Sequence, residues 1–233
     1  MTTIASNLQA VNDEIHHAVT QAKRTATSLK LLAVSKTFSA AEVRLAYLAG
    51  QTCFAENYVQ EAVDKIAALQ DLPLEWHFIG PIQSNKTRLI AQHFSWVHSV
   101  DRLKIAERLS AQRAENLPPL QICLQVNISD EASKSGVAPA DAFTLAMQLA
   151  RLPNVKLRGL MAVPAASDDV SAQRAAFAKL RALRDELNQH GLQLDTLSMG
   201  MSHDFPAAIA EGATLLRIGS AIFGNRIYSK EAV

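Results

Sequence analysis

Short apolar runs alternate along the chain with longer amphipathic stretches. The runs are nearly continuous in apolar residues, which is typical of parallel strands that are covered on both faces. They predict eight strands, at Leu29–Lys36, Thr52–Glu56, Glu75–Gly80, Trp96–Val100, Leu120–Ser129, Lys156–Val163, Thr196–Ser202 and Leu215–Phe223. The run Leu120–Ser129 alternates more strongly than the others, so we expect one of its faces to meet polar groups.

The amphipathic stretches between these runs predict helices. Ser39–Ala49 begins with a serine cap and a glutamate three residues later, and it ends before Gly50. The other predicted helices are an N-terminal one at Ile4–Arg24, then Asn57–Gln70, Asn85–His93, Asp101–Asn116, Ala140–Arg151, Val170–His190 and Asp204–Glu211.

This order of strands and helices predicts an α/β fold, a (β/α)8 TIM-type barrel with an extra N-terminal helix. An open doubly wound sheet is the alternative. No linker or low-complexity tract interrupts the pattern, so residues 1–233 are expected to form a single domain.

Composition narrows the function classes. Of the 233 residues, 48% are apolar, which is enough for a sizeable core. A formal net charge of +1 gives no electrostatic basis for binding nucleic acid or an acidic membrane. No apolar run is long enough to span a bilayer, and the N-terminus lacks the features of a signal peptide. Cys53 and Cys123 have no partner at CxxC spacing, which predicts two core thiols in a cytoplasmic protein.

Polar residues gather where the predicted strands end, and this is the face that carries the active site in such barrels. Lys36 closes the first apolar run, so its ammonium must enter the barrel mouth or reach water. Partial burial lowers the pKa of a lysine, and the neutral amine can then condense with an aldehyde. The alternative is a solvated lysine at a strand end.

The seventh and eighth strands carry a predicted phosphate site. Ser202 precedes a short helix, Gly219 lets the backbone approach a ligand closely, and Ser220 adds a hydroxyl donor. Arg217, two residues before Gly219, should point inward and needs a partner there, either a carboxylate or a ligand. Ordinary turn and packing roles are the alternative for these residues.

Other polar residues could line the same mouth. Asn57 is either a ligand contact or a helix cap, His77 a ligand contact or a core histidine, and Asn127 a ligand contact or a loop-capping amide. The polar loop 129–136 is either a lid that carries Lys134 inward or a solvated loop. The histidines and cysteines show no shared ligand spacing, so no metal is predicted.

Seven segments together resemble the pyridoxal phosphate homeostasis protein family, which is related to the N-terminal barrel domain of alanine racemase. The resemblance covers nearly the whole chain, and several of the segments are long enough to be specific. They are LLAVSK at Leu31–Lys36, FAENYVQE at Phe54–Glu61, WHFIGPIQSNK at Trp76–Lys86, NISDEASKSG at Asn127–Gly136, RGLMAV at Arg158–Val163, SMGMSHDFPAAIAEGAT at Ser198–Thr214 and RIGSAIFG at Arg217–Gly224.

The resemblance implies a fold-type III barrel that holds pyridoxal 5′-phosphate (PLP) as a Schiff base. It places the Schiff-base lysine on Lys36, the phosphate contacts on Ser202, Gly219 and Ser220, the arginine at the pyridine nitrogen on Arg217, and an asparagine beside the cofactor on Asn57. Members are thought to carry or buffer PLP in vitamin B6 homeostasis. Transient contact with apoenzymes that use PLP would follow from such a role.

The predicted residues favour a carrier over an enzyme. An arginine at the pyridine nitrogen disfavours protonation of the ring and weakens it as an electron sink. The chain has no room for the second domain of alanine racemase, so a monomer without robust turnover is expected, although Tyr228 is a conceivable substitute for the missing acid/base. A weak amino-acid racemase is the alternative. A third hypothesis is a barrel for another phosphorylated metabolite, with Lys36 as a salt-bridge partner.

Overall fold

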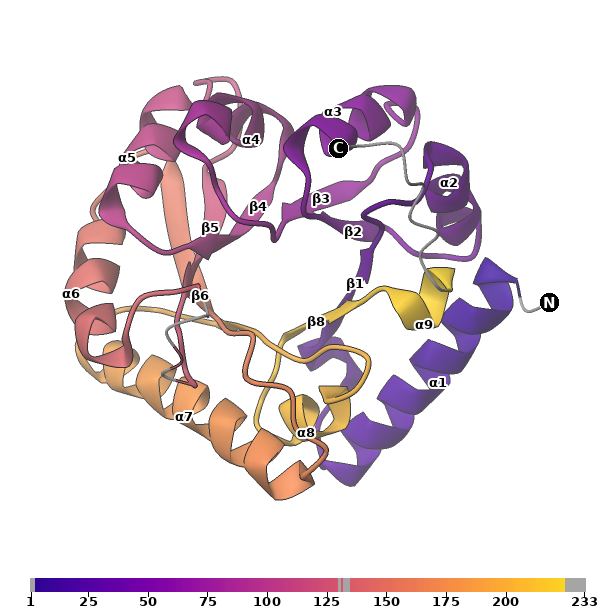
Figure 1. The fold of residues 1–233 in the computed structure, drawn as a ribbon. Helices are drawn as coiled ribbons and strands as arrows, with labels where there is room; N and C mark the ends of the chain where they lie inside the picture. Colours follow the sequence, from indigo (N-terminus) through magenta and orange to yellow (C-terminus); the bar gives the residue numbers. More distant parts are fainter. Residues whose placement is uncertain (1–2, 130, 132–134, 225–233) are drawn as a thin grey trace.

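The computed structural model describes residues 3–129, 131 and 135–224, and its strands form a closed parallel barrel (Figure 1). Each strand pairs with the next along the chain, and the last pairs with the first. The strands are β1 (Lys30–Val34), β2 (Cys53–Glu56), β3 (Glu75–Phe78), β4 (Trp96–Val100), β5 (Leu120–Gln125), β6 (Val155–Met161), β7 (Thr196–Ser198) and β8 (Leu215–Ile218). The predicted TIM-type barrel is therefore confirmed, and the open sheet is excluded.

Helices surround the strands in the order in which they follow one another along the chain (Figure 1). They are α1 (Ile4–Gln21), α2 (Ala40–Leu48), α3 (Val59–Ala68), α4 (Thr87–His93), α5 (Leu103–Gln112), α6 (Pro139–Leu149), α7 (Val170–Gln189), α8 (Phe205–Ala210) and α9 (Ser220–Phe223), with short 3-10 turns at Ala26–Ser28 and Ser84–Lys86. The predicted serine cap is present, because Ser39 Oγ accepts from the Glu42 N–H and Glu42 Oε2 accepts from the Ser39 N–H. Among the described residues, no helix has the length and apolar character needed to cross a membrane.

The predicted extra helix, α1, takes a place in the outer ring. It packs against α8, α9 and α2, so it closes the ring at the point where β8 meets β1 (Figure 1). Its buried residues lie on one stripe with helical spacing: Leu8, Val11, Ile15, Ala18 and Val19. In many barrels of this class a long helix after the last strand fills this position, whereas here that strand is followed by the four-residue helix α9.

Several predicted strands are too long at their carboxyl ends. The prediction of a strand over Leu215–Phe223 is wrong in its second half, because the strand ends at Ile218 and the chain turns into α9. That turn is closed by the Ile222 N–H, which donates to the Gly219 carbonyl at 2.9 Å. The strand predicted to reach Ser202 ends at Ser198, since Gly200 leaves the strand with φ 95°. Because the strands end early, polar residues such as Ser202 and Ser220 lie beyond the strands, above the barrel.

Alternating side chains along each strand build two separate buried layers. On β3, Trp76 and Phe78 point outward into the apolar layer beneath the helices, whereas Glu75 and His77 point inward. The interior of the barrel is packed rather than hollow. Its apolar part is formed by Leu32, Val34, Cys53, Ala55, Trp96, Cys123, Met161 and Leu215. The two cysteines are buried and free, as expected of core thiols.

Candidate functional site

A cavity of about 340 Å³ opens at the carboxyl ends of the strands. Its volume lies near the lower end of the range for small-molecule sites, about 300–1,000 Å³. All six residues that the sequence marks for ligand binding line this one cavity. The full lining is Val34, Lys36, Asn57, Ile79, Met161, Val163, Met201, Ser202, His203, Arg217, Gly219 and Ser220.

Lys36 is half-buried and stands two residues after the end of β1. The residues on either side of it are anchored. The Ser35 N–H donates to the Ala55 carbonyl at 3.0 Å, and the Thr37 N–H donates to Glu61 Oε1 at 2.6 Å. Thr37 has φ 70°, a conformation that β-branched residues rarely adopt. The backbone is therefore held in an unusual turn at the residue that follows the candidate nucleophile.

A buried ion pair supports the same region from behind. Lys65 Nζ lies 2.6 Å from Glu56 Oε1, and both side chains are almost completely buried. The same ammonium donates to the Ser35 carbonyl at 2.8 Å, while Ser35 Oγ donates to Glu56 Oε1 at 2.6 Å. Burial raises the pKa of Glu56, and the Lys65 charge opposes that rise. The cluster ties together the residues that directly precede Lys36 and Asn57.

This cluster was not predicted from the sequence, although the sequence carries a signal for it. Lys65 shares the buried face of α3 with Val59 and Ala62, at spacings of three residues. Glu56 closes a strand that is otherwise apolar. A lysine on an apolar helix face and a glutamate at the end of the preceding strand predict a buried pair.

Asn57 brings an unsatisfied polar atom to the cavity. Its Oδ1 is buried and has no hydrogen-bond partner among the residues that the structure describes, which is unusual for a buried carbonyl oxygen. Asn57 does not cap α3 through its side chain, since the residue at the cap position is Tyr58. Its backbone is packed tightly against Gly80, where an added Cβ would lie 2.1 Å from the Asn57 carbonyl oxygen. The glycine thus allows β3 to end directly beside the asparagine.

Arg217 points into the barrel from β8, as the sequence predicts. It is 4% exposed, and its two terminal nitrogens are held by Ser198 Oγ at 2.6 Å and by the Ala162 carbonyl at 2.9 Å. Burial lowers the pKa of Arg217 to about 10, so the guanidinium remains charged at neutral pH. Within the described part of the chain, no carboxylate forms an ion pair with it.

The predicted phosphate contacts lie on two neighbouring loops. Ser202 is half-buried in the loop between β7 and α8, and this loop is closed by Asp204 Oδ1, which accepts from the Met201 N–H at 2.6 Å. Ser220 is exposed at the start of α9. Gly219 lies between β8 and α9, where an added Cβ would come within 3.0 Å of the Val34 carbonyl oxygen. Two hydroxyl donors therefore border the cavity on the same side of the barrel.

The remaining candidates fall elsewhere. His77 lies fully buried inside the barrel and does not line the cavity. The Asn127 side chain donates to the Glu131 carbonyl at 2.8 Å, which fits its interpretation as a loop-capping amide. Lys134 and Tyr228 lie outside the described residues. Two further residues, Met201 and His203, line the cavity from the loop after β7 and were not predicted from the sequence.

Potential metal ligands meet at the opposite end of the barrel, although the sequence predicts no metal. Cys53, Glu75 and His77 offer ligand atoms that all lie within 4.8 Å of one another. Glu75 Oε1 is 2.8 Å from Lys30 Nζ and 2.7 Å from His77 Nε2. A metal ion at this point would have to displace an ammonium group from the carboxylate.

Comparison with known proteins gives consistent results over the whole chain. The family described as alanine racemase, N-terminal domain, matches residues 11–226. A pyridoxal phosphate homeostasis protein of Pseudomonas aeruginosa is 60% identical over 232 residues, covering 100% of both chains. The protein of the same name from Escherichia coli strain K12 is 51% identical and covers 99% of this chain and 100% of its own.

Solved structures agree with these matches. PipY of Synechococcus elongatus with PLP bound is 42% identical, covers 95% of this chain and 100% of its own, and superposes with a TM-score of 0.83. Alanine racemase from Corynebacterium glutamicum is 18% identical, covers 94% of this chain and 63% of its own, and superposes with a TM-score of 0.66. The likeness to alanine racemase shows a shared barrel fold.

Proposed function

Because this chain belongs to the pyridoxal phosphate homeostasis protein family, we propose that it binds PLP in the cavity above the barrel. Lys36 holds the cofactor as a Schiff base, and the protein serves in vitamin B6 homeostasis by carrying or buffering PLP. The observation that carries this proposal is the convergence of six chemically suited residues on one cavity: Lys36, Asn57, Ser202, Arg217, Gly219 and Ser220.

The cavity fits the cofactor group by group. Lys36 carries an amine that can condense with an aldehyde, and Ser202 and Ser220 carry hydroxyls that can donate to a phosphate. Asn57 Oδ1 is buried without a partner in the described part of the chain, and it is an acceptor that a bound group can satisfy. Arg217 offers a charged donor toward the ring. Apolar side chains complete the wall, among them Ile79, Met161 and Val163.

When bound, PLP supplies an aldehyde that condenses with amines and a ring that can stabilise negative charge. Arg217 limits the second of these properties. A guanidinium only donates hydrogen bonds, and with a pKa of about 10 it does not give up its proton at neutral pH. The residue therefore orients the ring without protonating it, which suits a carrier better than an enzyme of carbanion chemistry.

Weak amino-acid racemisation is the competing outcome. Besides Lys36 and Arg217, the described residues of the cavity wall include one further titratable group, the exposed His203. This imidazole is the candidate for a second acid or base. Sustained loss of α-deuterium from an amino acid, abolished in His203→Ala, would favour the racemase.

A carrier would release PLP during transient contact with apoenzymes, and a monomer suffices for that role. We propose a cytoplasmic location, because both cysteines are free, buried thiols.

The first experiment is a visible absorbance spectrum of the purified protein incubated with PLP, followed by borohydride reduction and peptide mass mapping. We expect a yellow protein whose reduced pyridoxyl group maps to Lys36. Lys36→Ala should lose all covalent label, whereas Lys104→Ala, a change of an exposed lysine on α5, should keep it. A wild-type protein that stays colourless and unlabelled would favour a different phosphorylated ligand.

A further inference from the structure

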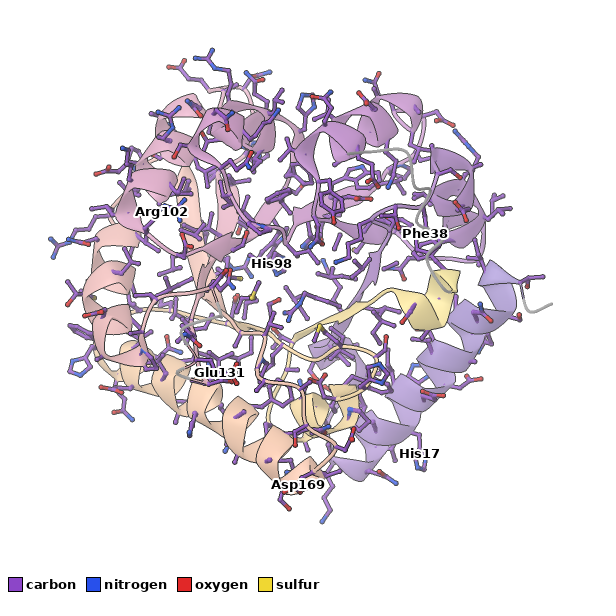
Figure 2. All side chains as sticks on the ribbon, viewed as in Figure 1. His17, Phe38, His98, Arg102, Glu131 and Asp169 are labelled. Carbon is purple, nitrogen blue, oxygen red and sulfur yellow. The ribbon has the colours of Figure 1, made fainter. Side chains whose placement is uncertain are left out.

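A continuous chain of hydrogen bonds runs through the interior of the barrel to the cavity. Glu75 Oε1 lies 2.7 Å from His77 Nε2, and His77 Nδ1 lies 2.9 Å from His98 Nε2. His98 Nδ1 then lies 2.7 Å from Ser198 Oγ, which accepts from Arg217 Nη1 at 2.6 Å. Figure 2 shows His98 near the centre of the ring of strands. The chain thus links β3, β4, β7 and β8.

The two ends of the chain fix the direction of every bond in it. Arg217 can only donate and an ionised Glu75 can only accept. Burial lowers the pKa of both His77 and His98, so each ring is neutral and has one donor and one acceptor nitrogen. His77 must then donate through Nε2 to Glu75, His98 through Nε2 to His77, and Ser198 through its hydroxyl to His98. Each group donates toward the carboxylate.

The chain joins two different environments. His77, His98 and Ser198 are fully buried, whereas the Glu75 side chain is 34% exposed at the amino-terminal end of the barrel. There Lys30 Nζ lies 2.8 Å from the carboxylate. At the other end Arg217 lines the cavity. A charge on the far face of the barrel is therefore connected to the wall of the ligand site by four successive hydrogen bonds.

We infer that Ser198, His98, His77 and Glu75 are positioning residues for Arg217. Ser198 Oγ holds one terminal nitrogen while the Ala162 carbonyl holds the other, and these two contacts fix the plane of the guanidinium. The rest of the chain keeps Ser198 Oγ available as an acceptor, because it commits the Ser198 hydroxyl hydrogen to His98. The donors that Arg217 presents to PLP then have a fixed orientation. This inference rests on the proposed function.

The test compares changes on the chain with a neighbouring change off it. Ser198→Ala removes the acceptor of Arg217, Ser198→Thr keeps a hydroxyl, and Glu75→Gln keeps an acceptor but removes the charge. Leu197→Val is the control, since Leu197 is buried in the same strand and faces the outer layer. The readouts are the Kd for PLP, the visible absorbance maximum of the bound cofactor, and the histidine tautomers from nitrogen-15 NMR.

We expect Ser198→Ala to raise the Kd about 5- to 20-fold and to shift the absorbance maximum, because a hydrogen bond to a charged group is lost. Ser198→Thr and Leu197→Val should stay within about two-fold of the wild type. NMR should show His77 and His98 neutral and protonated on Nε2, and Glu75→Gln should move the His98 signals.

Three results would overturn the inference while leaving the proposed function intact. They are a folded Ser198→Ala protein with the Kd and spectrum of the control, either ring protonated on Nδ1, and a Glu75→Gln protein with unchanged His98 signals. If Ser198→Ala does not fold, the His98 signals of Glu75→Gln test the inference instead. A wild-type protein that takes up no PLP overturns the proposed function itself, and the positioning role with it.

Discussion

Side chains on the outer face of the strands meet the helices, and those on the inner face meet one another. The outer layer is largely apolar, with fully buried residues such as Phe54, Leu109 and Phe177. The inner layer combines apolar side chains with the hydrogen-bonded chain that ends at Arg217. The ligand cavity belongs to the inner layer. Stability and binding are thus carried by different layers, and mutations should separate them.

The buried ion pair on the outer side of β2 is an exception to this division. It lies in the outer layer, yet it supports the residues next to Lys36 and Asn57. Lys65→Met should lower the free energy of unfolding by about 3–5 kcal/mol, because it leaves Glu56 buried without a cation. Urea unfolding measures the change. The exposed Lys179→Met is the control, and the double variant Lys65→Met/Glu56→Gln should recover part of the loss. A loss below about 1 kcal/mol would contradict a structural role for the pair.

Changes in the apolar outer layer should lower the free energy of unfolding without changing the affinity for PLP. Leu109→Ala removes a fully buried side chain on α5 and should lower the free energy of unfolding by about 2–5 kcal/mol. The Kd for PLP, measured well below the unfolding transition, should be unchanged. Leu48→Ala, at a position that is 73% exposed, should change stability by less than about 0.5 kcal/mol. A large loss of PLP affinity in folded Leu109→Ala would show that the layers are coupled.

Changes in the cavity wall should weaken PLP binding and leave the stability of the protein nearly unchanged. Ser202→Ala and Ser220→Ala should each weaken PLP binding by about 1.5–3 kcal/mol, or roughly 10- to 150-fold in Kd, because each removes a donor to a charged phosphate. The thermal midpoint of the ligand-free protein should barely move. Ser171→Ala, at an exposed position on α7, serves as the control in equilibrium titrations. Unchanged affinity in the double variant would reject the phosphate site.

The smallest expected effect is the pH dependence of the free energy of unfolding that arises from the neutral, buried imidazole of His98. Burial holds the pKa of His98 well below 6.5. As the pH falls through 6.5, the imidazole therefore becomes protonated in the unfolded chain but stays neutral in the folded protein. The free energy of unfolding should therefore fall as the pH falls below 6.5, by about 1.4 kcal/mol for this ring between about pH 7.5 and 5.5. Urea unfolding at both pH values should show a smaller loss in His98→Gln and an unchanged loss in the exposed His93→Gln. Equal losses of unfolding free energy in the wild type, His98→Gln and His93→Gln would mean that the His98 ring is protonated in the folded state as well.

The sequence predicts the order of the elements well because that order depends on local pattern. Continuous apolar runs and helical periodicity mark the eight strands and the helices α1 to α8, whereas the short helix α9 was predicted as part of a strand. Strand ends are harder to predict, since the strands end near Gly200 and Gly219 while apolar residues continue beyond both glycines, at Met201 and at 221–223. The six cavity residues were identifiable because each lies close to or just beyond the carboxyl end of a strand, and the barrel brings all such positions to one face.

Contacts across the barrel could not be predicted in this way. His77 and His98 are separated by 21 residues, and Ser198 lies 100 residues beyond His98. Their spacing carries no local signal, and their meeting depends on the register of four strands. The register itself is set by the packing of the whole closed sheet. For the same reason the grouping of Cys53, Glu75 and His77 was not foreseen.

The position of α1 has a consequence for the order in which the protein can complete its fold. The helix is synthesised before the eight strands of the barrel, whereas two of its packing partners, α8 and α9, are synthesised after β7 and β8 respectively. Asn7 donates to the Ile222 carbonyl at 3.0 Å, and Arg24 to the Ile209 carbonyl at 2.9 Å. On the ribosome, the apolar stripe of α1 cannot complete its packing until α8 and α9 have emerged. A nascent chain that stalls before α8 therefore exposes part of this stripe, which makes it a target for chaperones and proteases until α8 and α9 have been synthesised.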